Sequence, residues 1–150
     1  MKYMVLNTRH TGFVVSDLKK FIKFYEGFGL RLISRMIEEG DYIDNLVGLK
    51  NVKLEWAKLS LPDGSLIELL KYHTHIDSLK SDGEVQLSNR LGCSHIALTV
   101  KNIDDAIQYI CKAGGSIKNK YQISPDGNVK VAYCYDIEGN ILEIVQELKL

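Results

Sequence analysis

Residues 7–25 read NTRHTGFVVSDLKKFIKFY, and they place His10 ahead of an alternating apolar run that leads into a helical pattern. Residues 92–110 read GCSHIALTVKNIDDAIQYI and repeat this arrangement around His95. The apolar positions at helical spacing also recur 85 positions later. The two stripes are Leu18, Phe21, Ile22 and Tyr25, then Ile103, Ala106, Ile107 and Ile110. The repeat at an offset of 85 positions indicates that the fold consists of two similar halves.

The residues that flank each predicted helix repeat as well. Asp17 and Asn102 occupy equivalent positions and are good N-caps, because their side-chain oxygens can accept the first free backbone N–H groups. Gly29 and Gly114 follow the helices, where a left-handed residue commonly ends them. Each half of the chain therefore reads as strand, cap, helix and glycine stop.

A second pair of matching segments closes each half, at an offset of 75. LPDGSLIELLKY at 61–72 corresponds to DIEGNILEIVQE at 136–147, so that Glu68 corresponds to Glu143. DG at Asp63 and Gly64 predicts a tight hairpin turn. The smaller offset gives the first half about ten more residues, and we expect these in an extended loop at 37–53. Tyr42, Leu46, Val47 and Leu49 are apolar for a loop, so we expect it to cover a cavity or a partner subunit.

These patterns predict an α+β fold of two paired βαβββ modules, with a cupped mixed sheet and the helices outside. We expect one domain over 1–150, with module one at 1–72, a polar linker at 73–91 and module two at 92–150. The second module should form strands from GSIKNKY, NVKVAYCY and NILEIVQE. His73 and His75 in the linker are expected to be solvated loop residues.

Alternation along the strands assigns the histidines and glutamates to one face. In HIALTV the larger apolar residues share the face toward the helix, which leaves His95 on the concave side, and the same parity places His10 there. Glu68 and Glu143 lie in otherwise apolar rows, where an isolated carboxylate is costly and needs a cation. Taken singly, each residue is more simply a hydrogen-bonded or solvated side chain. Matched pairs in a duplication favour a divalent metal site.

Composition excludes other classes of partner. Nineteen basic and nineteen acidic residues give a formal net charge of zero, so neither nucleic acid nor a membrane is an expected partner. The N-terminus lacks the pattern of a secretory signal, and we expect a cytoplasmic protein. Cys93, Cys111 and Cys134 have no CxxC spacing and are expected to be buried, reduced thiols.

The sequence resembles the vicinal oxygen chelate superfamily, which includes glyoxalase I, methylmalonyl-CoA epimerase, extradiol dioxygenases and bleomycin- and fosfomycin-resistance proteins. Residues 10–32 and 61–70 carry the resemblance in the first half, and 95–115 and 135–146 carry it in the second. It implies a homodimer in which His10, Glu68, His95 and Glu143 bind one divalent metal ion: Co, Ni, Mn, Zn or Fe. DIEG at 136–139 departs from the usual Asp-Pro-Asp-Gly but keeps the glycine.

The resemblance leaves several activities open. Two histidines with a single carboxylate are typical of the dioxygenases, so the second carboxylate here favours a non-redox role. A glyoxalase I-like lactoylglutathione lyase usually has a Thr-His-Asn-Trp-Gly run after its first glutamate, whereas Glu68 is followed by LLKYHTH. Residues 40–49 and 58–72 look more like the acyl-CoA epimerase branch. We therefore expect a metal-dependent isomerase acting on an acyl-CoA, with the lyase, an iron dioxygenase and a small-molecule binding protein as alternatives.

The resemblance also implies the chemistry. The substrate is a small carbonyl compound, the metal stabilises an enolate, and a carboxylate moves the proton next to the carbonyl. Glu143 is the expected proton carrier, with Glu68 as its counterpart. Glu39, Asp41 and Asp44 in the 37–53 segment are more simply read as solvated loop residues.

Overall fold

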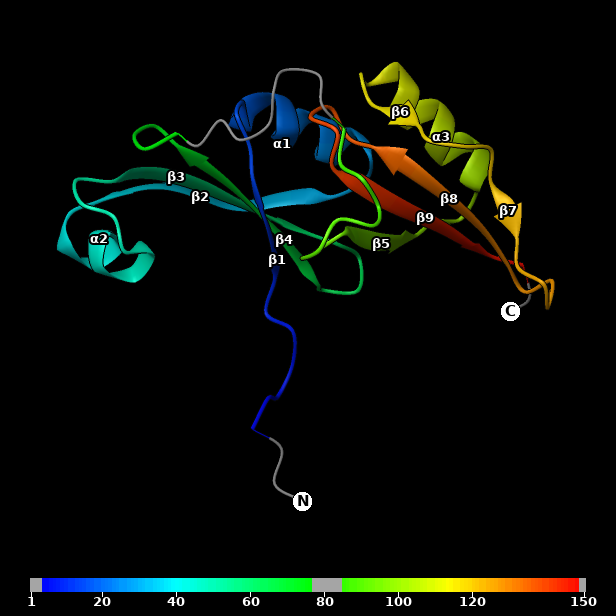
Figure 1. The fold of residues 1–150 in the computed structure, drawn as a ribbon, viewed down its shortest axis with the longest axis horizontal. Helices are drawn as coiled ribbons and strands as arrows, with labels where there is room; N and C mark the ends of the chain where they lie inside the picture. The colour runs from blue at the N-terminus through cyan, green and yellow to red at the C-terminus, as the bar shows by residue number, and fades with distance from the viewer. Residues whose placement is uncertain (1–3, 77–84, 149–150) are drawn as a thin grey trace. The chain divides into compact units, whose positions relative to one another are not determined.

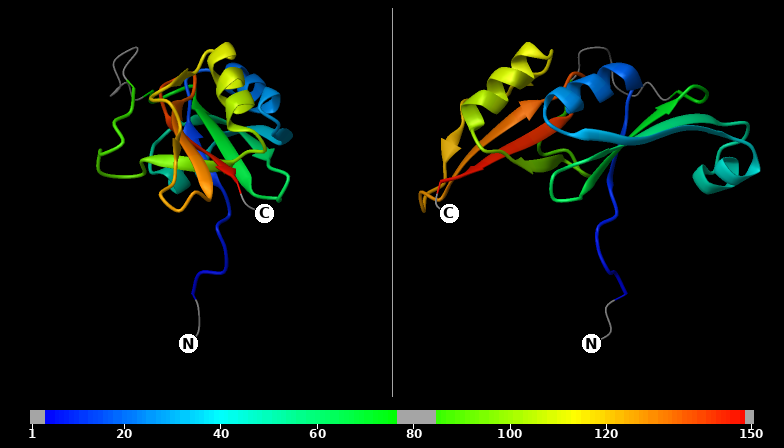
Figure 2. Two further views of the ribbon diagram at one scale, coloured as in Figure 1. Left: turned by 90° about the vertical axis from the view of Figure 1, so that its right-hand side faces the viewer. Right: turned by 180° about the vertical axis from the view of Figure 1, so that it is seen from behind.

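The computed structural model describes residues 4–76 and 85–148 (Figure 1). The chain divides into two compact units, Met1–Asp77 and Ser78–Leu150. Each unit has its own mixed sheet and a long helix packed against one face of that sheet, as two further views also show (Figure 2). The α+β class and the division into two related modules are therefore confirmed.

The first unit has six elements. They are β1 (Thr11–Val14), α1 (Leu18–Gly27), β2 (Arg31–Glu39), α2 (Asp41–Val47), β3 (Lys53–Ser60) and β4 (Leu66–Tyr72). The strand order is β1-β4-β3-β2. β1 runs parallel to β4, and the other pairs are antiparallel. This order brings the start of the module beside its last strand, which is how His10 comes close to β4.

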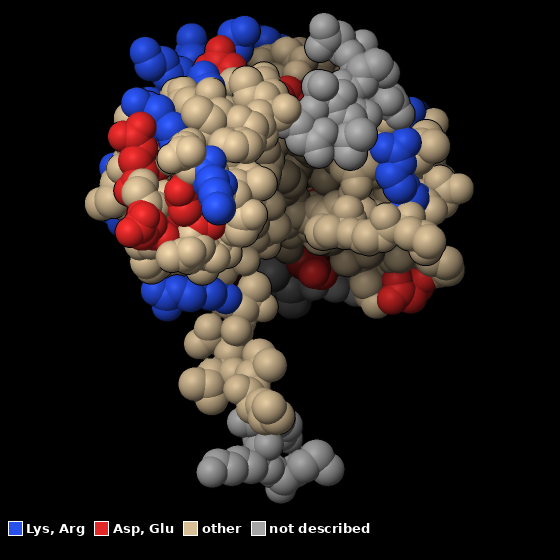
Figure 3. Space-filling model, turned by 60° about the vertical axis from the view of Figure 1, so that its left-hand side comes forward, with Lys and Arg blue, Asp and Glu red and all other residues tan. Residues whose placement is uncertain are grey.

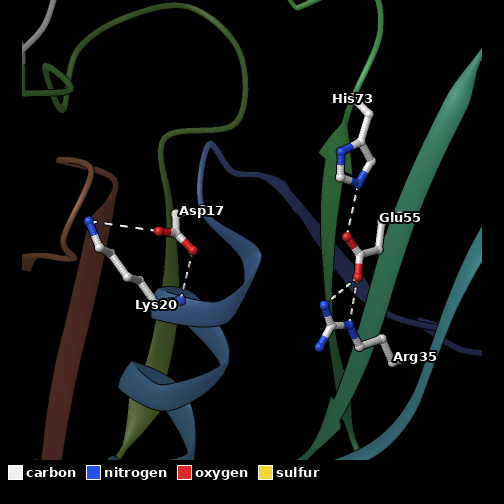
Figure 4. A network of polar contacts seen from close by, with 5 residues as sticks. All are labelled: Asp17, Lys20, Arg35, Glu55 and His73. Carbon is white, nitrogen blue, oxygen red and sulfur yellow. Dashed lines mark hydrogen bonds and ion pairs between the residues drawn. The ribbon is translucent and has the colours of Figure 1, made fainter.

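Helix α1 is positioned by its cap and by its apolar stripe. Asp17 accepts a hydrogen bond from the backbone N–H of Lys20 at 3.1 Å, and its carboxylate also pairs with the Lys20 ammonium (Figure 4). Phe21 and Tyr25 are fully buried, and Phe13 of β1 stacks on Tyr25. The predicted N-cap and buried stripe are confirmed, and Phe13 faces the helix as strand parity requires.

The segment 37–53 is not the extended loop that the sequence suggested. β2 continues through Glu39, and a second helix, α2, follows directly. Ile43 of α2 packs with Val52 and Leu54. Partly buried Leu70 and Tyr72 of β4 join this cluster, so α2 lies on the sheet face opposite α1 (Figure 1). The contacts that hold α2 are distant in sequence, which is why local pattern did not reveal it.

The second unit repeats the plan, but among its described residues it has no counterpart of α2, and two short strands take the place of β2. Its elements are β5 (His95–Thr99), α3 (Ile103–Lys112), β6 (Ser116–Ile117), β7 (Gln122–Ile123), β8 (Val129–Tyr135) and β9 (Ile141–Glu147). The order is β5-β9-β8-β6, with β7 also paired to β8. β5 is parallel to β9, as β1 is to β4. Asn102 caps α3 by accepting from the N–H groups of Asp104 and Asp105, as predicted.

The strand expected from GSIKNKY is therefore shorter than predicted. Only Ser116 and Ile117 pair with β8 before the chain leaves the ladder, and Gln122 and Ile123 resume the pairing. At the start of β7, the Gln122 side chain donates to the backbone carbonyls of Lys120 and Tyr121, which lie in the segment between the two strands.

The cysteine prediction is also partly wrong. Cys134 is buried in the sheet, and burial raises its pKa to about 11. Cys93 and Cys111 are exposed, although all three are free thiols. Within the described residues, no helix is long and apolar enough to cross a membrane. Basic and acidic side chains are interspersed on the face drawn in Figure 3, in keeping with the zero net charge.

Candidate functional site

Each unit brings one predicted histidine and one predicted glutamate together. In the first unit His10 lies just before β1, and its Nε2 is 3.0 Å from Oε2 of Glu68 on β4. The backbone register places Gly12 opposite Glu68, so the imidazole reaches the carboxylate diagonally along the same face of the sheet. We call this side of each sheet, which carries His10 and Glu68 or His95 and Glu143, the front face.

The second unit builds the same pair at the same register. His95 Nε2 is 2.7 Å from Oε2 of Glu143, and Ala97 lies opposite Glu143 as Gly12 lies opposite Glu68. The residues that face the two glutamates across the parallel ladders, Gly12 and Ala97, are both small. The offsets of 85 and 75 in the sequence thus correspond to an identical two-residue construction in each unit.

The donor atoms of each pair fit a divalent metal ion. Imidazole nitrogen and carboxylate oxygen bind such ions at about 2.0–2.2 Å, which places two adjacent ligand atoms roughly 3 Å apart. The His–Glu separations of 3.0 and 2.7 Å are of that size. Among the described residues, no group of three or more His, Cys, Asp or Glu side chains is placed so that it could hold an ion. Each unit by itself brings together one imidazole and one carboxylate.

The residue facing each glutamate differs between the units, and sequence reasoning missed both. Lys58 of β3 lies directly opposite Glu68, with Nζ 3.4 Å from Oε1. Tyr133 of β8 takes the corresponding place opposite Glu143. Burial raises the pKa of Tyr133, and the charge of Glu143 and a hydrogen bond to it add to this rise. Lys58 and Tyr133 each precede the facing glutamate by ten positions, and the predicted turn lies midway between the two residues of each pair. This equal spacing on either side of the turn could have revealed both residues from the sequence.

The second nitrogens of the two imidazoles also have different surroundings. Nδ1 of His95 is 2.7 Å from the hydroxyl oxygen of Ser94, which fixes the orientation of the ring. Nδ1 of His10 is buried and has no hydrogen-bond partner within the part of the chain that the structure describes. A buried polar atom without a partner is uncommon in a folded protein.

A third histidine–glutamate pair lies on the opposite face of the first sheet (Figure 4). Glu55 is buried, its Oε2 lies 2.9 Å from Nε2 of His73, and its Oε1 accepts from Nε of Arg35 at 2.7 Å. Burial alone would raise the pKa of Glu55, but the hydrogen bonds and charges of Arg35 and His73 outweigh it and lower that pKa. His73 lies in the loop directly after β4, as expected, but its ring is part of this ion-pair network and is not simply solvated. The Arg35 guanidinium neutralises this buried carboxylate.

The acidic residues of the 37–53 segment hold local structure. Asp44 accepts hydrogen bonds from the backbone N–H groups of Asn51 and Val52 at 2.6 and 2.8 Å, closing the turn after α2. Glu39 pairs with Lys53 on the neighbouring strand. Asp41 is exposed at the start of α2. Asp44 is therefore a structural residue and not the solvated side chain that we expected.

Comparison with known proteins places this geometry in context. The sequence pattern of the Glyoxalase/Bleomycin resistance protein/Dioxygenase superfamily matches residues 8–144. A lactoylglutathione lyase of Schizosaccharomyces pombe is 29% identical, and the match covers 92% of this chain and 46% of that protein. The chain thus spans about half the length of this curated relative.

Solved structures share the fold. The crystal structure of a glyoxalase family protein from Bacillus cereus is 28% identical and superposes with a TM-score of 0.88, covering 99% of this chain and 98% of that one. A fosfomycin resistance protein from Listeria monocytogenes, solved with Mn(II) and a sulfate ion, is 18% identical with a TM-score of 0.59. It covers 95% of this chain and 93% of that one.

Proposed function

The chain belongs to the Glyoxalase/Bleomycin resistance protein/Dioxygenase superfamily, and from that premise we propose that it is a divalent-metal-dependent enzyme that moves a proton next to a carbonyl group. The observation that supports this proposal is the pair of histidine–glutamate contacts at equal register in the two units. His10, Glu68, His95 and Glu143 would serve as the ligands of one ion per chain.

A bound divalent ion would supply Lewis-acid stabilisation of the negative charge that develops on the carbonyl oxygen. The chain itself must supply the proton carrier. Glu143 is the first candidate, because its carboxylate is partly exposed on the front face and faces the Tyr133 hydroxyl, which can help to hold it in place. Glu68 would be the counterpart, acting on the opposite side of the reacting carbon.

For the reaction we propose a lactoylglutathione lyase-type conversion of the adduct between glutathione and methylglyoxal. The support is the sequence similarity to the lyase of S. pombe, which extends over most of this chain. Epimerisation of an acyl-CoA is a second candidate, and the sequence LLKYHTH directly after Glu68 favours it because the lyase-like run is missing there.

Metal binding provides the first test. Titration calorimetry with Ni²⁺ or Zn²⁺ should give one ion per chain, and His10→Ala, Glu68→Gln, His95→Ala and Glu143→Gln should each weaken binding by at least about tenfold. His73→Ala is a matched control, since it removes an imidazole that also contacts a glutamate but lies on the other face. If the four variants bind as tightly as the unchanged protein, the proposed ligand set is wrong.

Activity provides the second test. Metal-loaded protein is assayed for consumption of the glutathione–methylglyoxal adduct, and in parallel for solvent deuterium incorporation into 2-methylmalonyl-CoA. Glu143→Gln should lower the rate by about 10²–10⁴ while leaving the fold intact. Turnover of only the second substrate would overturn the lyase proposal in favour of the epimerase. Oxygen uptake with bound iron would contradict both.

A further inference from the structure

Lys58 is a charged residue on the front face of the first sheet, and the proposed reaction does not use it. It lies directly opposite Glu68, and the two side chains form an ion pair with 3.4 Å between Nζ and Oε1. His10 contacts the other carboxylate oxygen, Oε2. The glutamate is therefore held between an imidazole and an ammonium group, and both of its oxygens are engaged before any ion arrives.

The ammonium has a second contact that does not depend on Glu68. Its Nζ lies 4.5 Å from the centre of the Trp56 ring, within the range of a cation–π interaction. Trp56 precedes Lys58 by two positions on β3, so both side chains lie on the front face. Lys58 can thus stay on the front face, in contact with the Trp56 indole, when the Glu68 carboxylate binds an ion instead.

The rest of this part of the face offers little to replace a lost carboxylate. The neighbouring front-face residues are Trp56 and Ser60 on β3, Leu66 and Leu70 on β4, and Ser34 on β2, directly opposite Lys58. The Lys58 side chain is about three-quarters covered, at 26% exposure. An anionic partner therefore stabilises the Lys58 ammonium more than it would stabilise the ammonium of a fully solvated lysine.

Comparison of the two units shows that the fold does not require this lysine. The corresponding residue of the second unit is Tyr133, which carries no charge and still lies opposite a glutamate in the same register. A tyrosine hydroxyl can hold a carboxylate without opposing a bound cation. Lys58 adds a positive charge close to a proposed metal ligand in one unit only, so its presence calls for a role of its own.

We propose that Lys58 is the counter-ion of Glu68 in the metal-free protein and binds a carboxylate group of the substrate when Glu68 serves the metal. This inference rests on the proposed function. The ligand class follows from the contact itself, because the group that the ammonium already holds is a carboxylate. Lys58 is in this sense a residue that selects substrates carrying an acid group.

Two measurements with opposite expected directions test the proposal. In the first, Zn²⁺ is titrated calorimetrically into the unchanged protein and into Lys58→Met. The variant should bind Zn²⁺ about tenfold more tightly, because Glu68 is no longer paired with a competing cation. Lys53→Met is the matched control: Lys53 lies on the same strand and pairs with Glu39 at a similar distance of 3.3 Å, but faces the other side. Lys53→Met should leave the affinity for Zn²⁺ unchanged.

In the second measurement, succinate is titrated into the Zn²⁺-loaded proteins, with succinamide as the uncharged analogue. Trp56 is the single tryptophan of the chain, so its fluorescence reports events beside Lys58 directly. Succinate should bind about fivefold or more weakly to Lys58→Met than to the unchanged protein, although that variant holds Zn²⁺ more tightly. Lys58→Arg should restore succinate binding, and succinamide should not distinguish the proteins.

The outcomes separate this inference from the proposed function. If the unchanged protein binds neither Zn²⁺ nor Ni²⁺, both are overturned. If it binds Zn²⁺ but Lys58→Met matches it in Zn²⁺ affinity or in succinate affinity, the role of Lys58 is overturned and the metal site stands. A general loss of structure in Lys58→Met would weaken the binding of both Zn²⁺ and succinate. The proposal instead requires the affinity for Zn²⁺ to rise and the affinity for succinate to fall.

Discussion

Tyr133 lies directly across the β8–β9 ladder from Glu143, and its ring centre is 5.2 Å from that of His95. One side chain thus contacts both members of the second histidine–glutamate pair. The ring packs against the imidazole, and the hydroxyl bonds the carboxylate. This arrangement makes Tyr133 a positioning residue for the pair.

Tyr133→Phe keeps the ring against His95 and removes the hydroxyl. We expect metal affinity to fall about tenfold, because the carboxylate of Glu143 loses the group that holds it in place. The free energy of unfolding should change by about 1 kcal/mol or less, since the aromatic packing remains. Calorimetric titration and urea unfolding measure the two quantities. Unchanged metal binding would show that the hydroxyl has no part in holding Glu143.

Ser94→Ala should weaken metal binding through His95. The Ser94 hydroxyl is 2.7 Å from Nδ1 of His95, and loss of such a partner lets the imidazole rotate away from its binding orientation. We expect a decrease in affinity of about tenfold, with Ser94→Thr retaining most of it. His10→Ala serves as a comparison, because it removes the other imidazole altogether. Equal affinities for Ser94→Ala and the unchanged protein would rule out this orienting role.

The Glu55 network predicts a specific dependence of stability on pH. The pKa of Glu55 lies below its usual value of 4.5 in the folded protein, so its contribution is fully present above that value. The contribution is lost as the pH falls through the lowered, folded-state pKa. Glu55→Gln should therefore lose about 1–3 kcal/mol of unfolding free energy at pH 7.

Urea unfolding at a series of pH values below 7 measures this difference. Asp17, Asp63 and Asp126 also have lowered pKa values, so the unchanged protein has other acid-sensitive groups. Only the difference between the two proteins isolates Glu55, and that difference should shrink as the solution becomes more acidic. A constant difference down to about pH 3 would contradict the assignment.

Asp44→Ala should loosen α2 without unfolding the sheet. The Asp44 carboxylate satisfies the backbone N–H groups of Asn51 and Val52, and their loss should cost about 1–2 kcal/mol locally. Hydrogen exchange should accelerate over α2 and the turn that follows it. Asp41→Ala, an exposed change at the start of the same helix, is the control. If both variants exchange alike, the two hydrogen bonds do not hold the helix.

The duplication made much of the fold and of the candidate site predictable. The offsets of 85 and 75 paired His10 with His95 and Glu68 with Glu143, and strand parity assigned them to one face. Within each unit the structure brings histidine and glutamate together as parity requires. The prediction succeeded because the alternation of side chains between the two faces of a strand is a local property of the backbone, and the duplication shows the same alternation twice.

The parts that the sequence did not reveal depend on distant contacts. Helix α2 begins at Asp41 after Gly40, which supplies no side-chain cap, and it is held by residues of other strands. His73 is a loop residue, as expected, but its contact with Glu55, which lies 18 positions away, could not be predicted from the local sequence. No local pattern contains such information. Lys58 differs from these cases, because the symmetry of its hairpin was readable and was not used.

The nine-residue strand β2 has one neighbour, β3, among the described strands of its sheet, so its outer backbone groups lack a ladder partner there. Such an edge can recruit a strand from another molecule and so begin aggregation. Two features of β2 work against this: a register irregularity between Leu32 and Ser34, and charged side chains at Arg31, Arg35, Glu38 and Glu39. Replacing these charges with apolar residues would convert the edge into a nucleus for misassembly, whereas the split β6 and β7 give the second unit no comparable length of exposed ladder among its described residues.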